Sequence, residues 1–123
     1  MVTAEGCRTI WEAYRAVLEG GTILVGDGQA DASSADTELA GSNVASTAIS
    51  EIEVLPPEDD MESYRLVIRG VFQPGEANFE WRERGVKLKD GTLIDRTVAD
   101  GGRKAPGFTV TVEHELDLMP DLL

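Results

Sequence analysis

The sequence contains little of the chemistry from which catalytic and metal centres are usually built. Its 123 residues include one cysteine, Cys7, and one histidine, His114. A single cysteine cannot form an internal disulfide, so nothing indicates an oxidising compartment. One His and one Cys are also too few for a His- or Cys-based metal site within one chain. We predict that His114 is a hydrogen-bonded core or interface residue and that Cys7 is a small buried apolar residue.

Long apolar runs are absent as well. No stretch approaches the ~18 to 20 apolar residues that cross a bilayer. The first residues lack the basic and apolar regions of a secretory signal. We therefore expect a soluble protein that is not exported by the secretory route and has no membrane partner.

Cations are scarce, and lysine is the scarcest of them, with only Lys87, Lys89 and Lys104. Aspartate and glutamate total 23 against 11 lysines and arginines, which gives a net charge of −12. A field of this sign repels polyanions, so we expect no nucleic-acid partner. Acidic, lysine-poor composition is typical of proteins that work in concentrated salt. The alternative is an ordinary acidic protein that its charge keeps soluble.

The residues that are present predict one helix followed by strands. Over residues 3–21, apolar side chains recur at spacings of three and four, Thr3 is a suitable N-cap, and Gly20-Gly21 ends the pattern. Strands are predicted at residues 22–25, 45–55, 63–72 and 108–118, with two more within 79–98. We predict a single domain, mainly β with an N-terminal α-helix, folded as an antiparallel β-sandwich. Its parts are the helix (1–21), the sandwich (22–118) and an apolar tail (119–123).

Two segments between these elements are predicted to be loops. Residues 29–42 are small and polar, and a loop of that length is functional, packed on a neighbour or mobile. Residues 100–107 are predicted to be a flexible loop that carries Arg103 and Lys104. In the strand that follows, Phe108, Val110, Val112, Leu116 and Leu118 are predicted to face inward.

A hairpin over residues 79–98 is predicted to be the centre of the fold. Asp90 and Gly91 provide the turn. Phe79 and Trp81 alternate out of phase with Val86 and Leu88, so the first strand needs an irregularity near Glu83-Arg84-Gly85, where Gly85 serves either a bulge or a close backbone approach. Gly85→Val is then expected to destabilise the protein by at least ~1 kcal/mol. The same change at Gly41, in the polar loop, is expected to be milder. The structural residues predicted for this hairpin are Glu83, Gly85, Asp90, Gly91 and Arg96.

The carboxylates do not form a recognisable catalytic or metal-binding pattern. Asp27, Asp31 and Asp36 do not have EF-hand spacing and lack its closing Glu, so they do not predict a calcium site. Gly26-Asp27-Gly28 lacks the third glycine of a dinucleotide fingerprint, and the predicted helix precedes the strand instead of following it. We therefore predict neither enzyme activity nor a cofactor.

Several short motifs nevertheless occur together in one order across residues 3–118. They are Thr3-Ala4-Glu5-Gly6, Gly20-Gly21-Thr22-Ile23-Leu24-Val25-Gly26-Asp27-Gly28, Asp36-Thr37-Glu38-Leu39, Glu83-Arg84-Gly85-Val86-Lys87-Leu88, Asp90-Gly91-Thr92-Leu93 and Arg96. In this order they resemble phage tail-collar fibre protein N-terminal domains, the anchoring domains of tailed-virus fibres and baseplates. Val86 and Lys87 replace the family's usual apolar pair, and the loop after Gly28 has no proline.

The resemblance implies a virion structural protein of a tailed virus, located at the tail or baseplate and assembled in the host cytoplasm. The acidic composition adds a halophilic, haloarchaeal virus as the source. Because no fibre shaft follows, we expect an adaptor or ring component whose contact with the host surface is indirect. Its expected partners are copies of itself, in a ring or trimer, and other tail or baseplate proteins.

The alternative function is that of a small monomeric β-sandwich module that binds a ligand or carbohydrate. The apolar tail favours assembly, because a subunit can dock such a tail on a neighbour. A tail that folds back on its own domain is the other interpretation. The candidate assembly residues are Trp11, Tyr14, Leu118, Met119, Leu122 and Leu123.

Overall fold

A computed structural model describes residues 3–56 and 65–116, which form a helix followed by six antiparallel strands. The predicted class, mainly β with an N-terminal helix, is confirmed. The elements are α1 (Ala4–Leu18), β1 (Thr22–Gly26), β2 (Val44–Leu55), β3 (Arg65–Phe72), β4 (Glu80–Lys87), β5 (Leu93–Arg103) and β6 (Val110–Leu116).

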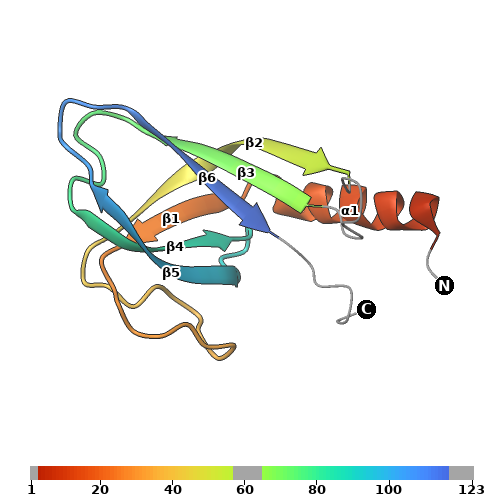
Figure 1. The fold of residues 1–123 in the computed structure, drawn as a ribbon, viewed down its shortest axis with the longest axis horizontal. Helices are drawn as coiled ribbons and strands as arrows, with labels where there is room; N and C mark the ends of the chain where they lie inside the picture. The colour runs from red at the N-terminus through yellow and green to blue at the C-terminus, as the bar shows by residue number, and fades with distance from the viewer. Residues whose placement is uncertain (1–2, 57–64, 117–123) are drawn as a thin grey trace.

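The strands form one sheet in the order β5-β4-β1-β2-β3-β6, curled so that its two halves face each other (Figure 1). β2 belongs to both halves, because its first residues pair with β1 and its last residues pair with β3. The register shifts between Ile49 and Glu51, and such a bulge lets a strand bend. The two layers of the predicted sandwich are therefore the two halves of one continuous sheet, β1-β4-β5 and β2-β3-β6.

The core fills the space between these halves. It is built from residues that alternate along the strands, as the sequence predicts for β3 and β6. Trp11 and Leu18 of α1 join the same cluster where β3 begins and β6 ends (Figure 1). The strand residues of the core are Ile23, Val25, Leu66, Ile68, Phe72, Trp81, Val86, Val112 and Leu116.

α1 begins and ends at the predicted signals. The Thr3 hydroxyl accepts a hydrogen bond from the Gly6 amide at 3.0 Å, and Gly20 takes the left-handed conformation (φ 82°) that stops the helix. Its N-terminal half extends past the end of the sheet (Figure 1). No helix among the described residues is long and apolar enough to span a membrane.

The predicted loop at residues 100–107 is wrong in its first half. β5 continues to Arg103, and it places residues 99–101 opposite the single Arg82 of β4. The Lys104 ammonium is buried and donates to the Gln73 carbonyl oxygen (2.9 Å) and to Asn78 Oδ1 (3.1 Å). Phe108, which we predicted to face inward, lies in the following turn with 66% of its surface exposed.

β4 contains the predicted irregularity, but Gly85 is not its site. The register against β5 shifts between Trp81 and Glu83, so Trp81 joins the core while Glu83 faces the other side of the sheet. Gly85 pairs regularly with Leu24 and Arg96, and a second register shift against β5 lies between Val86 and Lys87. The extra residues of β5 opposite Arg82 cause the switch of face, so the prediction of a register switch at Gly85 is corrected.

Candidate functional site

The carboxylate of Glu83, on the outer face of β4, is bound by several hydrogen-bond donors. It accepts hydrogen bonds from the amides of Gly28 (2.7 Å), Ala40 (2.9 Å) and Gly41 (2.8 Å). All three donors belong to the loop of residues 27–43, which joins β1 to β2. Only 1% of Glu83 is exposed, so this loop covers the outer face of the β1-β4-β5 half at that point.

Arg96 of β5 completes the site from the neighbouring strand. Its Nε donates to Glu83 Oε1 at 2.9 Å, and Nη1 donates to Asp36 Oδ2 at 3.0 Å. The carbonyl oxygens of Ala30 and Asp31 accept from Nη2 and Nη1 at 2.7 and 3.2 Å. We call Glu83, Arg96 and Asp36, with the three loop amides, the Glu83 clasp.

The clasp keeps its acids ionised. Burial raises the pKa of the Glu83 carboxyl, but hydrogen bonds from the Ala40 amide, Arg96 and the two glycine amides outweigh burial and lower it. The Ser33 amide and Arg96 lower the pKa of Asp36. In return, the bond to Glu83 raises the pKa of the Arg96 guanidinium, against its desolvation. These groups are charged at neutral pH and fully hydrogen-bonded, so the clasp can fix a loop but is not poised to transfer a proton.

The clasp joins motifs that lie far apart in the sequence. Glu83 and Arg96 were predicted as structural residues, and both are central to it. Leu39, from the predicted Thr-x-Leu motif, is buried beside them. A Cβ on Gly85 would lie 2.8 Å from the Asp95 carbonyl oxygen and 3.0 Å from Leu39 Cδ2. Gly85 is thus required for close packing under the loop. The loop at residues 29–42 is packed on its own domain, which was not among the three options that the sequence suggested.

Gly41 belongs to the clasp too, which argues against the expectation that Gly41→Val is milder than Gly85→Val. Its amide donates to Glu83, and a Cβ there would lie 2.6 Å from the Gly28 nitrogen. The polar composition of this loop predicted exposure. The fold instead turns the amides at both ends of the loop toward one buried carboxylate.

A second buried network crosses the core. Nδ1 of His114, on β6, accepts from Arg84 Nε of β4 at 3.1 Å. Nε2 therefore carries the proton, which it donates to Asp95 Oδ1 of β5 at 2.8 Å. Burial raises the pKa of Asp95, but the hydrogen bonds from His114 and Thr97, together with the nearby Arg84 guanidinium, outweigh burial and lower it. The sequence predicted that His114 is a hydrogen-bonded core or interface residue. The structure places it in the core, as a bridge between the two edge strands of the curled sheet.

The three aspartates considered for calcium do not converge. Asp27 accepts from the amide and the side chain of Asn43, at 3.1 and 2.7 Å, whereas Asp36 binds the Ser33 amide and Arg96. Among residues 3–56 and 65–116, no three His, Cys, Asp or Glu side chains are placed to hold a metal ion.

The largest cavity described, about 320 Å³, lies beside the clasp and is lined by Ala32, Ser33, Ser34, Asp36, Leu93, Ile94, Asp95 and Arg96.

The hairpin turn is confirmed. Gly91 adopts the left-handed conformation (φ 93°), its amide donates to the Leu88 carbonyl oxygen at 2.9 Å, and Asp90 Oδ1 accepts from the Thr92 amide at 2.9 Å. This turn closes β4 and β5, and it holds Glu83 and Arg96 on neighbouring strands.

Of the two assembly residues predicted on the helix, Trp11 needs a correction. Trp11 is only 3% exposed, because it packs in the protein's own core, and Tyr14 is half-buried beside it with ring centroids 5.8 Å apart. The exposed apolar side chains of α1 are instead Ile10 (45%) and Val17 (59%). Cys7 is half-buried instead of fully buried. Leu118, Met119, Leu122 and Leu123 lie outside the described residues.

The second exposed apolar feature is Phe108. The turn that carries it is fixed to the turn after β3, because Gly75 donates to the Pro106 carbonyl oxygen at 2.9 Å and Lys104 bonds Gln73 and Asn78. Nothing in the sequence pattern indicated that Phe108 is exposed, since its position fits the inward phase of β6. Ile10 and Val17 were visible in the helical pattern, but the pattern does not say which part of the stripe the sheet covers.

Comparison of the chain with protein-family models, curated proteins and solved structures finds no match in any of the three.

Proposed function

We propose that this protein is a structural subunit that assembles with copies of itself in a tailed-virus particle, at the tail or baseplate. The observation that carries the proposal is the uncovered apolar flank of α1, formed by Ile10, Ala13 and Val17. All three are exposed, and they lie beside the stripe through Trp11 and Leu18 that the sheet buries.

The two flanks of α1, on either side of its buried stripe, differ in composition. The opposite flank of α1 carries charged residues, among which Glu5 pairs with Arg8 and Glu12 lies 3.8 Å from Arg15. A helix whose only task is to cover its own sheet needs an apolar stripe on the buried side and polar residues elsewhere. In α1 the apolar surface is wider than the part that the sheet covers, and the excess lies on one flank only. Such an uncovered apolar surface favours a contact with another chain.

The use of the polar groups supports a structural role rather than a chemical one. The oxygens of Glu83 bind a loop, the nitrogens of His114 join three strands, and the ammonium of Lys104 fixes two turns. Each of these residues is at least 95% buried. Groups held in this way define a rigid shape, and a particle component needs such a shape.

The assignment to a tail or baseplate rests on the resemblance to tail-collar fibre domains. Residues from its separate motifs meet in the Glu83 clasp, namely Gly28, Asp36, Leu39, Glu83, Gly85 and Arg96. Because the net charge is −12, copies of the chain repel each other at low salt. We therefore expect assembly at high salt concentration.

Light scattering of the full chain across a range of sodium chloride concentrations tests the proposal. We expect a multimer that Val17→Asp converts to a monomer. Ala16→Asp is the matched control, because it adds the same charge to the same exposed turn of α1 but off the flank. A full-length chain that is monomeric in both low and high salt would contradict the assembly proposal.

The virion assignment needs its own experiment. Mass spectrometry of purified particles should detect the chain, and particle reconstruction should place it at the tail or baseplate. Detection only in the soluble fraction of infected cells would contradict this assignment and leave self-association standing.

One observation favours the alternative of a monomeric ligand-binding module, namely the 320 Å³ cavity beside Ser33 and Asp36. Its volume lies at the lower end for small-molecule sites. A carbohydrate titration followed by amide NMR shifts separates the two functions. Shifts centred on residues 32–36 and 93–96, in a chain that stays monomeric, would favour the module.

A further inference from the structure

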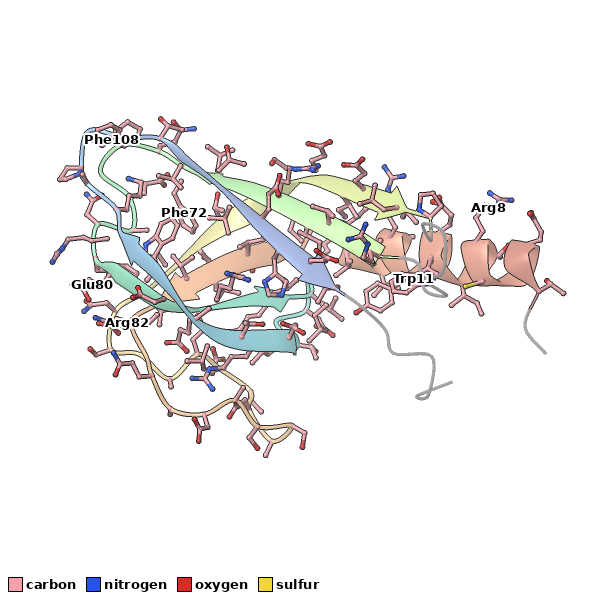
Figure 2. All side chains as sticks on the ribbon, in the orientation of Figure 1. Arg8, Trp11, Phe72, Glu80, Arg82 and Phe108 are labelled. Atoms are coloured by element: carbon pink, nitrogen blue, oxygen red, sulfur yellow. The ribbon has the colours of Figure 1, made fainter. Side chains whose placement is uncertain are left out.

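Two exposed apolar features lie at opposite ends of the molecule. One is the flank of α1, and the other is Phe108 on its turn. Figure 2 shows Phe108 at one end of the long axis and the outer part of α1, marked by Arg8, at the other. Phe108 is the most exposed of the large apolar side chains described, at 66%, and Val17 follows at 59%.

The residues on the flank of α1 are arranged like those of a hole in knobs-into-holes packing. Ile10, Ala13, Tyr14 and Val17 stand at positions i, i+3, i+4 and i+7, so they are the corners of one diamond on the helix surface. In packed helices, four such residues form the hole that receives one side chain of a partner. Ile10 and Val17 lie roughly 10.5 Å apart along the axis, and the small Ala13 between them leaves room for a ring. We call these four residues the α1 hole.

Phe108 has the form of the matching knob. Its turn cannot yield easily, because Lys104 is buried beneath it with bonds to Gln73 and Asn78, and Gly75 donates to Pro106. The Phe108 amide also donates to the Ala105 carbonyl oxygen at 3.3 Å. A rigid turn that displays one aromatic ring loses little conformational entropy when the ring is buried by a partner.

We infer that copies of this chain associate head to tail, with Phe108 of one copy inserted into the α1 hole of the next. This inference rests on the proposed function and specifies its interface. Pairing of α1 with a second α1 would bury Ile10 and Val17 but leave Phe108 in water, whereas the head-to-tail contact buries both features. Unlike surfaces in contact generate a closed ring, or a filament if the rotation does not close.

The distribution of charge favours the same contact. The outer face of the β2-β3-β6 half carries Glu51, Glu53, Glu113 and Glu115 around Arg65 and Arg69. Copies stacked through this face would bring like charges together, which is unfavourable. A contact through the ends of the molecule keeps these acidic faces apart.

A complementation experiment tests the inference. Phe108→Asp destroys the knob but keeps the hole, and Val17→Asp destroys the hole but keeps the knob. Each variant alone should be monomeric at a salt concentration where the unmodified chain assembles. An equal mixture should form a 1:1 heterodimer and stop there, because each partner keeps only one working surface. Phe108→Ala should weaken association by roughly tenfold or more, since it removes the buried ring.

Matched controls separate the contact from loss of folding. Thr109→Asp and Ala16→Asp place the same charge next to each feature and should assemble like the unmodified chain. Circular dichroism and melting temperatures should show that both test variants are folded.

The other outcomes each overturn the inference. Normal assembly of Phe108→Asp would show that α1 is covered by something else, such as a second α1 or the terminal residues 117–123. Two monomeric variants that fail to form the heterodimer would exclude the head-to-tail contact while leaving self-association intact. If the unmodified chain is monomeric at every salt concentration, the proposed function fails together with the inference.

Discussion

The two halves of the curled sheet use the same pair of residue types, Glu and Arg, on their outer faces, but in opposite surroundings. On β1-β4-β5, Arg96 and Glu83 lie beneath the loop of residues 27–43, with side-chain exposures of 3% and 0%. On β2-β3-β6, Arg69 binds Glu53 at 2.9 Å and Glu113 at 2.8 Å, and those carboxylates are 44% and 61% exposed. The distances are nearly equal, so burial is what distinguishes the two sites.

Burial changes what an ion pair does for the protein. If Glu113 is removed, water replaces it around Arg69, so the exposed group adds little to stability. If Glu83 is removed, no water takes its place, and three amides and a guanidinium lose their acceptor. The buried pair therefore determines where the loop lies, whereas the exposed group mainly keeps an acidic face soluble.

The largest expected effect is that of Glu83→Ala. We expect a loss of about 3 to 5 kcal/mol in the free energy of unfolding, because three amides lose their acceptor and the buried Arg96 guanidinium loses one of its two carboxylate partners. Urea denaturation followed by tryptophan fluorescence measures it. Glu113→Ala is the matched control on the other half of the sheet and should cost far less. Equal losses for the two variants would mean that the loop does not shield Glu83.

The next effect concerns the packing between the clasp and the sheet. Gly85→Val should destabilise by at least ~1 kcal/mol, because a side chain there meets the Asp95 carbonyl oxygen and Leu39. Gly107→Val is the appropriate control, since nothing lies within 4 Å of a Cβ at that position. A Gly85 variant as stable as the Gly107 variant would refute close packing at this point.

A smaller effect is expected when the pH is lowered, because the stabilisation from Glu83 depends on its charge. The folded-state pKa of Glu83 lies below its ordinary value of 4.5, so the unfolded chain binds the extra proton. The stabilisation from Glu83 is complete above pH 4.5 and is lost as the pH falls through the folded-state pKa. Glu83→Gln should therefore flatten the acid limb of a stability–pH curve. An unaltered acid limb in Glu83→Gln would contradict the lowered pKa.

Salt should give the smallest change, spread over the whole surface. With 23 acids against 11 cations, exposed carboxylates repel each other. Raising salt from 0.1 to 1 M shortens the Debye length from ~10 to ~3 Å, so the melting temperature should rise. Sucrose controls for general exclusion effects. The cost of Glu83→Ala should stay constant across this series, because its partners are buried. A melting temperature that is flat or falls with salt would remove the halophilic interpretation.

The sequence predicted best what local chemistry determines. The Thr3 cap, the Gly20 stop, the Asp90-Gly91 turn and the alternation of β3 and β6 each depend on a few neighbouring residues, and all were predicted. The register switch at Arg82 was misplaced, because it depends on the extra residues that β5 inserts from the partner strand.

The candidate site was likewise predicted only in part: individual residues were identified, but not the contacts between them. Motifs identified Glu83, Gly85 and Arg96 as important, but not that they meet one loop that lies earlier in the chain, with hydrogen-bonded partners 42 to 66 residues apart. Trp11 was assigned to assembly because periodicity shows only that a helix has an apolar stripe. It does not show how much of that stripe the sheet covers. Phe108 fits the inward phase of β6, and only the turn fixed by Lys104 explains why it is exposed.

The position of β1 in the sheet, between β2 and β4, has a consequence for the order of folding. β4 and β5 can pair as soon as their short turn closes, whereas β1 can reach β4 only after more than fifty intervening residues are arranged. The clasp needs β1, the loop and β4 together, so it belongs to a late step. Removing Glu83 should then speed unfolding far more than it slows folding. The lifetime of the folded chain is therefore set at the loop, by a carboxylate that is almost completely shielded from solvent.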